Sequence, residues 1–226
     1  HAYATSYLVH RGRRYTVALT RVEQGTSLVE VIKRLLHSTC RAGVRPNLLL
    51  LDRGFYSVAV IRYLQAARYP FLMPVVRKGR RPAHPRGPTG TWVFATWQRS
   101  GWSRYTLTST DHRTATVNIA VHCRNWRGRR GRHGRQRLIY AFWGFQPNST
   151  QWIVQVYRQR FGIETSYRQL GEACSKTTTH NPTLRLLFVG IALFLRNVWV
   201  HIGTIWRPRG AVHASSIWTS YASEPC

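Results

Sequence analysis

Residues 47–57 read Asn-Leu-Leu-Leu-Leu-Asp-Arg-Gly-Phe-Tyr-Ser, and this stretch decides the predicted fold. Four consecutive leucines are typical of a short strand that is buried on both faces. Helical periodicity stands on either side, over residues 26–42 and 57–67, and a second apolar run follows at 71–76. Strands that alternate with helices in this way predict an α/β layer.

The rest of the chain extends this layer in both directions. Residues 2–10 and 14–20 predict a hairpin before it, and the Pro- and Gly-rich residues 77–90 predict a loop after it. An antiparallel insertion is then predicted from short strand candidates at 91–97, 103–109, 115–122 and 136–143. Helices are predicted at 151–172 and 183–203, and the tail from residue 207 shows little pattern.

The charge predicts a polyanionic partner. The chain has 34 lysines and arginines against seven acids, a net charge of +27, and only Lys33, Lys78 and Lys176 are lysines. The guanidinium fork suits phosphate, so we expect binding to nucleic acid that weakens steeply with salt. A general bias of the proteome towards arginine explains part of this excess at most.

The cysteines and the apolar helix bear on the compartment. The four cysteines form no C-x-x-C pair, so reduced thiols in a cytoplasm are expected rather than disulfides or zinc. Arg185 and Arg196 leave ten residues between them, too few to span a bilayer, so residues 183–203 are predicted to form a buried core helix without a membrane partner.

Two acids stand out because acids are scarce. Asp52 follows a buried strand directly, where ligands of α/β folds bind. Its alternative role is to cap a helix, but Ser57 is better placed to cap residues 57–67. Glu164 shares one predicted helix face with three cations or aromatic residues, namely Tyr157, Arg160 and Arg168. The alternative for Glu164 is an ordinary surface ion pair with an arginine one turn away.

The pair suggests a divalent metal site that acts on phosphate. Mg²⁺ prefers carboxylate oxygens, and two such ions can serve the attacking and the leaving oxygen of a phosphoryl transfer. Asp52 and Glu164 are therefore the candidate ligands.

Two sequence blocks resemble a known family. Residues 48–57 are similar to the block around the second acid of DDE transposases. Tyr157-x-x-Arg160-x-x-x-Glu164 resembles the Y-x2-R-x3-E signature of the insertion sequence 4 type, which supplies the third acid. The resemblance implies an RNase H-like mixed sheet flanked by helices, with the antiparallel β insertion between the second and third acids.

The resemblance also implies an activity. It implies cleavage of DNA at element ends that depends on Mg²⁺ or Mn²⁺, with two ions, and strand transfer by the freed 3′-hydroxyl. Asp52 and Glu164 would be the catalytic metal ligands. Contacts to DNA would come from these residues of the core and of the Gly/Arg loop at 127–135: Arg53, Tyr157, Arg160, Arg168, Arg129, Arg130 and Arg132. Stacking on an unpaired base is a further idea, for Trp97, Trp102 and Trp126.

Two positions depart from the family pattern. The family has a lysine seven residues after its glutamate, where this chain has Gly171. The family's first catalytic aspartate would align before His1, so we expect an incomplete chain that binds DNA with little or no catalysis.

The expected organisation follows the resemblance. Four parts are expected: the first part of the core at 1–76, the insertion at 77–148, the helical part of the core at 149–206, and a tail at 207–226. The expected partner is double-stranded DNA, bound by a dimer in a prokaryotic cytoplasm beside the nucleoid. Two alternatives stay open: a non-catalytic basic protein that binds nucleic acid, and a nuclease of the same fold.

Overall fold

The computed structural model describes residues 2–10, 13–127, 133–161, 179, 181–205 and 216–223. The chain divides into two compact units. Unit 1 consists of His1–Leu50 and Gln159–Cys226, and unit 2 of Leu51–Arg158. Strands and helices occur in both, so the protein is of the mixed α/β class.

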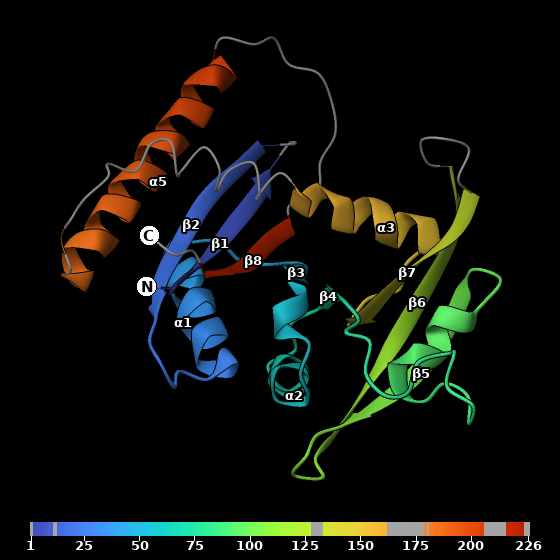
Figure 1. Ribbon diagram of the computed structural model, residues 1–226. Coiled ribbons are helices and arrows are strands. Elements are labelled where there is room, and N and C mark those ends of the chain that lie inside the picture. Colours follow the sequence, from blue (N-terminus) through green and yellow to red (C-terminus); the bar gives the residue numbers. More distant parts are fainter. Residues whose placement is uncertain are drawn as a thin grey trace. The chain divides into compact units, whose positions relative to one another are not determined.

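Unit 1 contains three strands that lie side by side (Figure 1). β1 (Ala2–His10) pairs antiparallel with β2 (Arg13–Val22) on one edge and with β8 (Ser216–Ser223) on the other. The predicted hairpin is confirmed, and β8 is a strand within the stretch whose sequence shows little pattern. Ile217, Trp218 and Tyr221 favour a strand, but serine and threonine between them hid the pattern.

The first helix of unit 1 forms as predicted. α1 (Leu28–Arg41) is capped by Ser27, whose Oγ accepts a hydrogen bond from the Glu30 N–H at 3.2 Å. The apolar side of α1 is buried, and a hydrogen bond of 2.8 Å between the hydroxyls of Ser6 and Thr39 joins the helix to β1.

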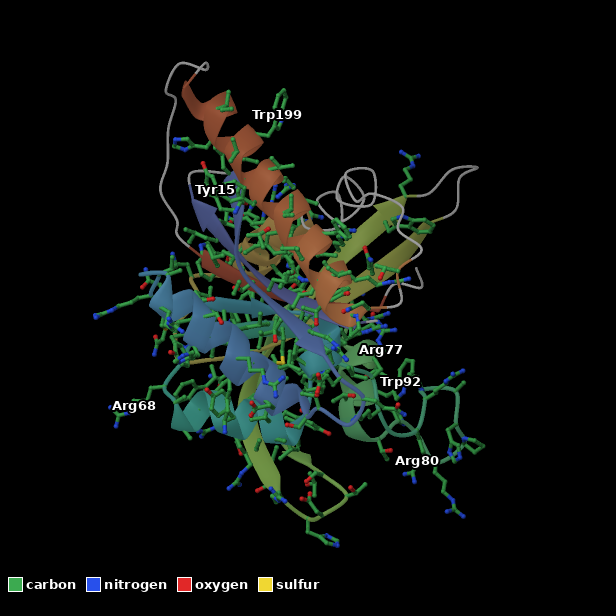
Figure 2. All side chains as sticks on the ribbon, turned by 90° about the vertical axis from the view of Figure 1, so that its left-hand side faces the viewer. Tyr15, Arg68, Arg77, Arg80, Trp92 and Trp199 are labelled. Atoms are coloured by element: carbon green, nitrogen blue, oxygen red, sulfur yellow. The ribbon has the colours of Figure 1, made fainter. Side chains whose placement is uncertain are left out.

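The long helix of unit 1 differs from its prediction. α5 (Pro182–Ile205) packs on β2 through Ala192 and Leu193, and Asn197 exchanges hydrogen bonds of 2.9 and 2.7 Å with the Thr16 backbone. Most of its other apolar side chains are exposed, including Trp199 at 76% (Figure 2). The prediction of a buried core helix is therefore wrong, because contact with β2 uses only a narrow stripe. By length and composition, Pro182–Gly203 is one helix of the described chain that could cross a membrane.

Unit 2 is built on a four-stranded antiparallel sheet. Its strand order is β4-β7-β6-β5, and the chain boundary between the two units falls within the short strand β3 (Leu49–Leu51). The sheet strands are β4 (Phe71–Pro74), β5 (Gly101–Thr108), β6 (Thr114–Arg127) and β7 (His133–Trp143). Both strands are longer than predicted, since β6 continues to Arg127 and β7 begins at His133.

Two α-helices accompany this sheet. Each is amphipathic and contacts β6, as Figure 1 shows for the second. α2 (Val58–Ala66) buries Val60, Ile61 and Leu64. α3 (Thr150–Arg158) buries Ile153, Val154 and Tyr157.

One predicted strand of the insertion is instead a 3-10 helix. Residues 91–97 were expected to be extended, but η2 spans Gly90–Thr96. Gly90 turns the chain with a φ of +59°, and the buried Thr91 hydroxyl donates to the Val76 carbonyl at 2.7 Å. The same hydroxyl accepts from the Lys78 N–H at 2.7 Å. These local bonds replace the pairing that a strand would need.

Two glycines of the loop before η2 provide a matched test of its packing. Both have positive φ, +97° at Gly79 and +72° at Gly87, but a Cβ on Gly79 would overlap the Thr89 carbonyl, whereas Gly87 faces open space. We expect Gly79→Ala to lower the free energy of unfolding by about 2–4 kcal/mol and Gly87→Ala by about 1–2 kcal/mol. Urea denaturation of the two variants measures the difference, and equal losses would contradict the close approach of the loop to residue 79.

Candidate active site

Asp52 stands where the chain leaves β3. The three leucines of β3 are at most 1% exposed, and a 3-10 turn, η1 (Arg53–Phe55), follows at once. Asp52 Oδ1 accepts a hydrogen bond from the Arg53 N–H at 2.7 Å, which fixes the direction of a partly exposed carboxylate. Ser57 caps α2 as predicted, with Oγ accepting from the Val60 N–H at 3.4 Å.

The second motif is joined to this strand by a buried hydrogen bond within unit 2. The Tyr157 hydroxyl donates to the Leu51 carbonyl at 3.1 Å, directly before Asp52. Tyr157 is only 3% exposed, and its ring centroid lies 5.0 Å from that of Tyr140. The structure therefore brings the first residue of the Y-x2-R-x3-E motif next to the strand that carries Asp52.

This contact was not predicted from the sequence, where Tyr157 was expected to contact DNA. The available signal was the position of Ile153 and Val154, four and three residues earlier, because such residues share a helix side. A tyrosine on a buried side needs a partner for its hydroxyl, and here the partner is main chain.

The structure describes only some of the other predicted site residues. Arg53 is exposed in η1, and Arg160 is 8% exposed in the short 3-10 helix η4 (Gln159–Phe161). α3 ends at Arg158, so the predicted continuous helix is interrupted there. The remaining predicted residues lie outside the described part of the chain: Glu164, Arg168, Arg129, Arg130 and Arg132.

The chemistry of the described site suits a hard cation. Asp52 provides carboxylate oxygens at the end of a rigid strand, and such oxygens are the ligands that Mg²⁺ prefers. No group of three His, Cys, Asp or Glu side chains is found among the described residues, so a softer, all-protein site such as zinc is not indicated there.

A histidine links the sheet to the start of α3. His122 Nδ1 lies 3.1 Å from the Thr150 hydroxyl. Burial lowers the pKa of His122, and the nearby charges of Arg124 and Arg158 lower it further. The folded protein therefore favours the neutral ring.

This shift predicts a pH dependence of stability. The unfolded chain binds the proton near pH 6.5, its ordinary value, whereas folded His122 binds it only at lower pH. Stability is thus retained above pH 6.5 and lost as the pH falls from there through the folded pKa. We expect the drop in Tm between pH 7.5 and pH 5 to be smaller in His122→Gln than in the parent chain, and an unchanged drop would contradict the shift.

Acids do little to neutralise unit 2. Of the four acids in the described chain, Glu23 and Glu30 belong to unit 1 and Asp111 pairs with its neighbour Arg113 at 2.6 Å. Asp52 is the remaining one. The positive charge of the arginines in the insertion is therefore left largely uncompensated by carboxylates.

The insertion presents aromatic side chains beside these arginines. Arg77 and Arg81 stack on Trp92 with guanidinium carbons 5.2 and 5.9 Å from the ring centroid, and Figure 2 shows Arg77 beside Trp92. The three tryptophans considered for base stacking differ. Trp97 and Trp102 pack edge-on against Phe94 and Phe142, but Trp102 is still 45% exposed, close to the 48% of Trp126 on β6.

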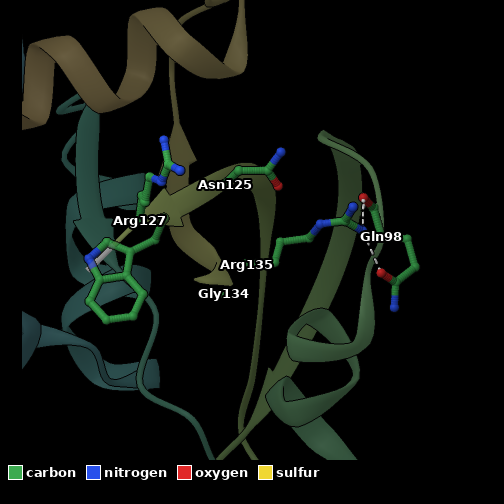
Figure 3. A pocket seen from close by; sticks show the side chains of 6 residues that line it. Gln98, Asn125, Arg127, Gly134 and Arg135 are labelled. Carbon is green, nitrogen blue, oxygen red and sulfur yellow. Dashed lines mark hydrogen bonds between the residues drawn. The ribbon is translucent and has the colours of Figure 1, made fainter. Parts of the chain in front are cut away.

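A hollow of about 460 Å³ lies beside the outer part of the β6–β7 hairpin. Four arginines contribute to its lining, Arg77, Arg124, Arg135 and Arg137, together with Trp126 and Gln136. A neighbouring hollow shares Arg135, which reaches across to Gln98 (Figure 3).

The comparison with protein families agrees with the motifs at the level of the DDE family. No curated protein matches the chain. The family described as Transposase DDE domain matches residues 14–195, which include β3, Asp52, the insertion and the Y-x2-R-x3-E motif. This match covers most of the chain and implies transposase activity on DNA. The chain belongs to the DDE-domain transposase family.

Proposed function

We propose that the chain acts in DNA transposition as a transposase of the insertion sequence 4 type, with an RNase H-like core. Membership in the DDE family supports the reaction class. The hydrogen bond from Tyr157 to the Leu51 carbonyl carries the proposal, because it joins one residue of each motif, both within unit 2.

The proposed reaction is a pair of phosphoryl transfers. Water attacks a phosphodiester at the element end, the P–O3′ bond breaks, and the leaving strand takes up a proton as a free 3′-hydroxyl. That hydroxyl then attacks a target phosphodiester, a new P–O3′ bond forms, and the displaced target strand leaves with its own 3′-hydroxyl. The number of phosphodiester bonds is conserved in the second step.

Asp52 and Glu164 are the proposed ligands of one or two Mg²⁺ or Mn²⁺ ions. When bound, such ions neutralise the charge that develops on the phosphate oxygens. Asp52 offers its carboxylate from the end of β3, oriented by the Arg53 N–H. Tyr157 is a positioning residue, since its hydroxyl holds α3 to the main chain beside Asp52.

The cations have a separate role in the proposal. Arg53 is exposed one residue after Asp52, which suits contact with the phosphates that flank the scissile bond. Arg160 and Arg168 belong to the same motif as Glu164 and are proposed to hold the DNA backbone. A dimer bound to DNA beside the nucleoid in the cytoplasm completes the proposal.

Strand transfer is the decisive test. The protein, expressed from its coding sequence as it stands in the genome, is incubated with duplexes from the ends of its own element, supercoiled plasmid and Mg²⁺. Joined products support a transposase. Cleavage without joining supports the nuclease alternative, and unchanged DNA in the presence of tight binding supports the non-catalytic alternative.

Metal binding is tested apart from catalysis. Fe²⁺ can replace Mg²⁺ and, with ascorbate and peroxide, cuts polypeptide close to the ion. We expect cuts near residues 52 and 164 that Mg²⁺ suppresses and that Asp52→Asn abolishes. Cutting that persists in Asp52→Asn at the same positions would remove this residue from the proposed site.

A further inference from the structure

The outer part of the β6–β7 hairpin is a two-stranded ribbon. β5 pairs with β6 only as far as Val121, and β4 pairs with β7 only from Tyr140 onwards. Residues 122–127 and 133–138 then pair with each other and with no other described strand. We call these twelve residues the arm; all of them belong to unit 2.

Both faces of the arm are basic. Successive residues of a strand point to opposite faces, so Arg124 and Trp126 share one face of β6, and Arg127 lies on the other. The cross-strand partners follow the same rule, which places Arg135 and Arg137 on the face of Arg127. If only one face of the ribbon contacted a binding partner, arginines would be needed on that face alone.

Neutral groups hold the arginines of the second face in place. Arg135 donates to the Gln98 side-chain oxygen at 2.6 Å and to the Gln98 carbonyl at 3.1 Å (Figure 3). Arg137 donates through Nε to the Trp97 carbonyl at 2.7 Å. These bonds also fasten the arm to the segment that precedes β5, so the arm does not depend on its own pairing alone, which is marginal for two strands.

The first face is arranged in the same way. Arg124 donates through Nε to the Gln136 side-chain oxygen at 2.7 Å, directly across the ribbon. A neutral acceptor orients a guanidinium but leaves its positive charge and several N–H donors uncompensated. No carboxylate lines the adjoining hollows among the described residues. Oriented but unneutralised arginines suit a ligand with phosphates on two sides.

We infer that the arm binds duplex DNA by entering the major groove edge-on, with each face against one phosphate wall. One sheet layer with its side chains is about 10 Å thick, which matches a major groove about 12 Å wide and exceeds a minor groove about 6 Å wide. The oxygens of Gln98 and Gln136 already hold arginines, so the contacts are mainly to phosphates and independent of sequence. Such a surface fits DNA of arbitrary sequence, as a target for insertion must be.

Salt dependence of binding tests the contacts. Affinity of the full chain for a labelled duplex of random sequence is measured by anisotropy from about 50 to 300 mM salt. Arg124→Gln and Arg127→Gln stand on opposite faces, and Arg127 is exposed at the far end of β6. We expect each to reduce the slope of log K against log salt by about 0.9, and the double variant by about 2.

The control removes equal charge elsewhere in unit 2. Arg68 and Arg104 are exposed outside the arm, and Figure 2 shows Arg68 far from Trp92. Arg68→Gln combined with Arg104→Gln should leave the slope within about 0.5 of the parent value, since neither contacts a phosphate under this inference. A slope that falls equally in both double variants would overturn the arm as the binding element. An effect of only one arm substitution would overturn the edge-on placement, since one face alone would then meet DNA.

The groove is tested on the DNA. Methylation of guanine N7 in the major groove should interfere with binding, whereas a ligand that fills the minor groove should not compete. The reverse result, or tighter binding of the single strand than of the duplex, would overturn the inference.

The inference rests on the proposed function only for its choice of DNA. If strand transfer fails while duplex binding still depends on the arm, the proposed chemistry is contradicted. If strand transfer is normal and the arm variants bind DNA like the parent chain, the role of the arm is contradicted.

Discussion

In the protein expressed from its coding sequence as it stands in the genome, Asp52→Asn is expected to reduce strand transfer by about a thousandfold, since a metal-binding carboxylate supports several kcal/mol of charge stabilisation and each 1.4 kcal/mol is tenfold in rate. Asparagine keeps an oxygen that can accept from the Arg53 N–H, so the turn after β3 should survive. Rates of plasmid joining and the Tm are measured together.

The matched control is another aspartate of the same unit. Asp111 lies exposed in the turn between β5 and β6, where it pairs with Arg113. Asp111→Asn adds the same charge to the chain but should leave the rate within about twofold, because surface ion pairs contribute about 0–1 kcal/mol. Equal losses in both variants would show that net charge, rather than the position of Asp52, sets the rate.

Tyr157→Ala is expected to lower the free energy of unfolding by about 3–5 kcal/mol, as large-to-small changes of buried aromatic residues do. It removes both the ring packed on Tyr140 and the hydroxyl bonded to Leu51. Tyr157→Phe keeps the ring and removes only the donor, which costs about 1–2 kcal/mol. Chemical denaturation gives both values.

The phenylalanine variant separates positioning from stability. If Tyr157 orients α3 beside Asp52, Tyr157→Phe should slow strand transfer at temperatures where the protein is fully folded, while duplex affinity is unchanged. A normal rate in the folded variant would leave the hydroxyl with a purely structural role.

The elements of the core were predictable because each carries its own local signal. The leucine run of β3 and the capped, periodic α1 and α2 need no distant partner to be recognised. Residues 91–97 defeated the same reasoning, because Thr91 takes its partners from Val76 and Lys78, more than a dozen residues away. Alternation of polar and apolar residues cannot reveal such bonds.

The site was predictable in composition but not in arrangement. Scarcity of acids singled out Asp52, and its place after a buried strand is confirmed. The contact between Tyr157 and Leu51 spans 106 residues of sequence and was not anticipated. Helical periodicity also failed at Gln159–Phe161, where a 3-10 turn replaces the regular helix. Glu164 lies outside the described residues, so its part in the site stays a prediction.

The nesting of the two units has a consequence for how the chain folds as it is made. Unit 2 is one uninterrupted stretch, so all of its strands have been synthesised before the last third of the protein is begun. Unit 1 is split, and β1 must wait for β8, more than 200 residues later, to gain its second neighbour. Nascent chains released after about residue 160 should therefore protect the insertion from protease while the first hairpin is still cut.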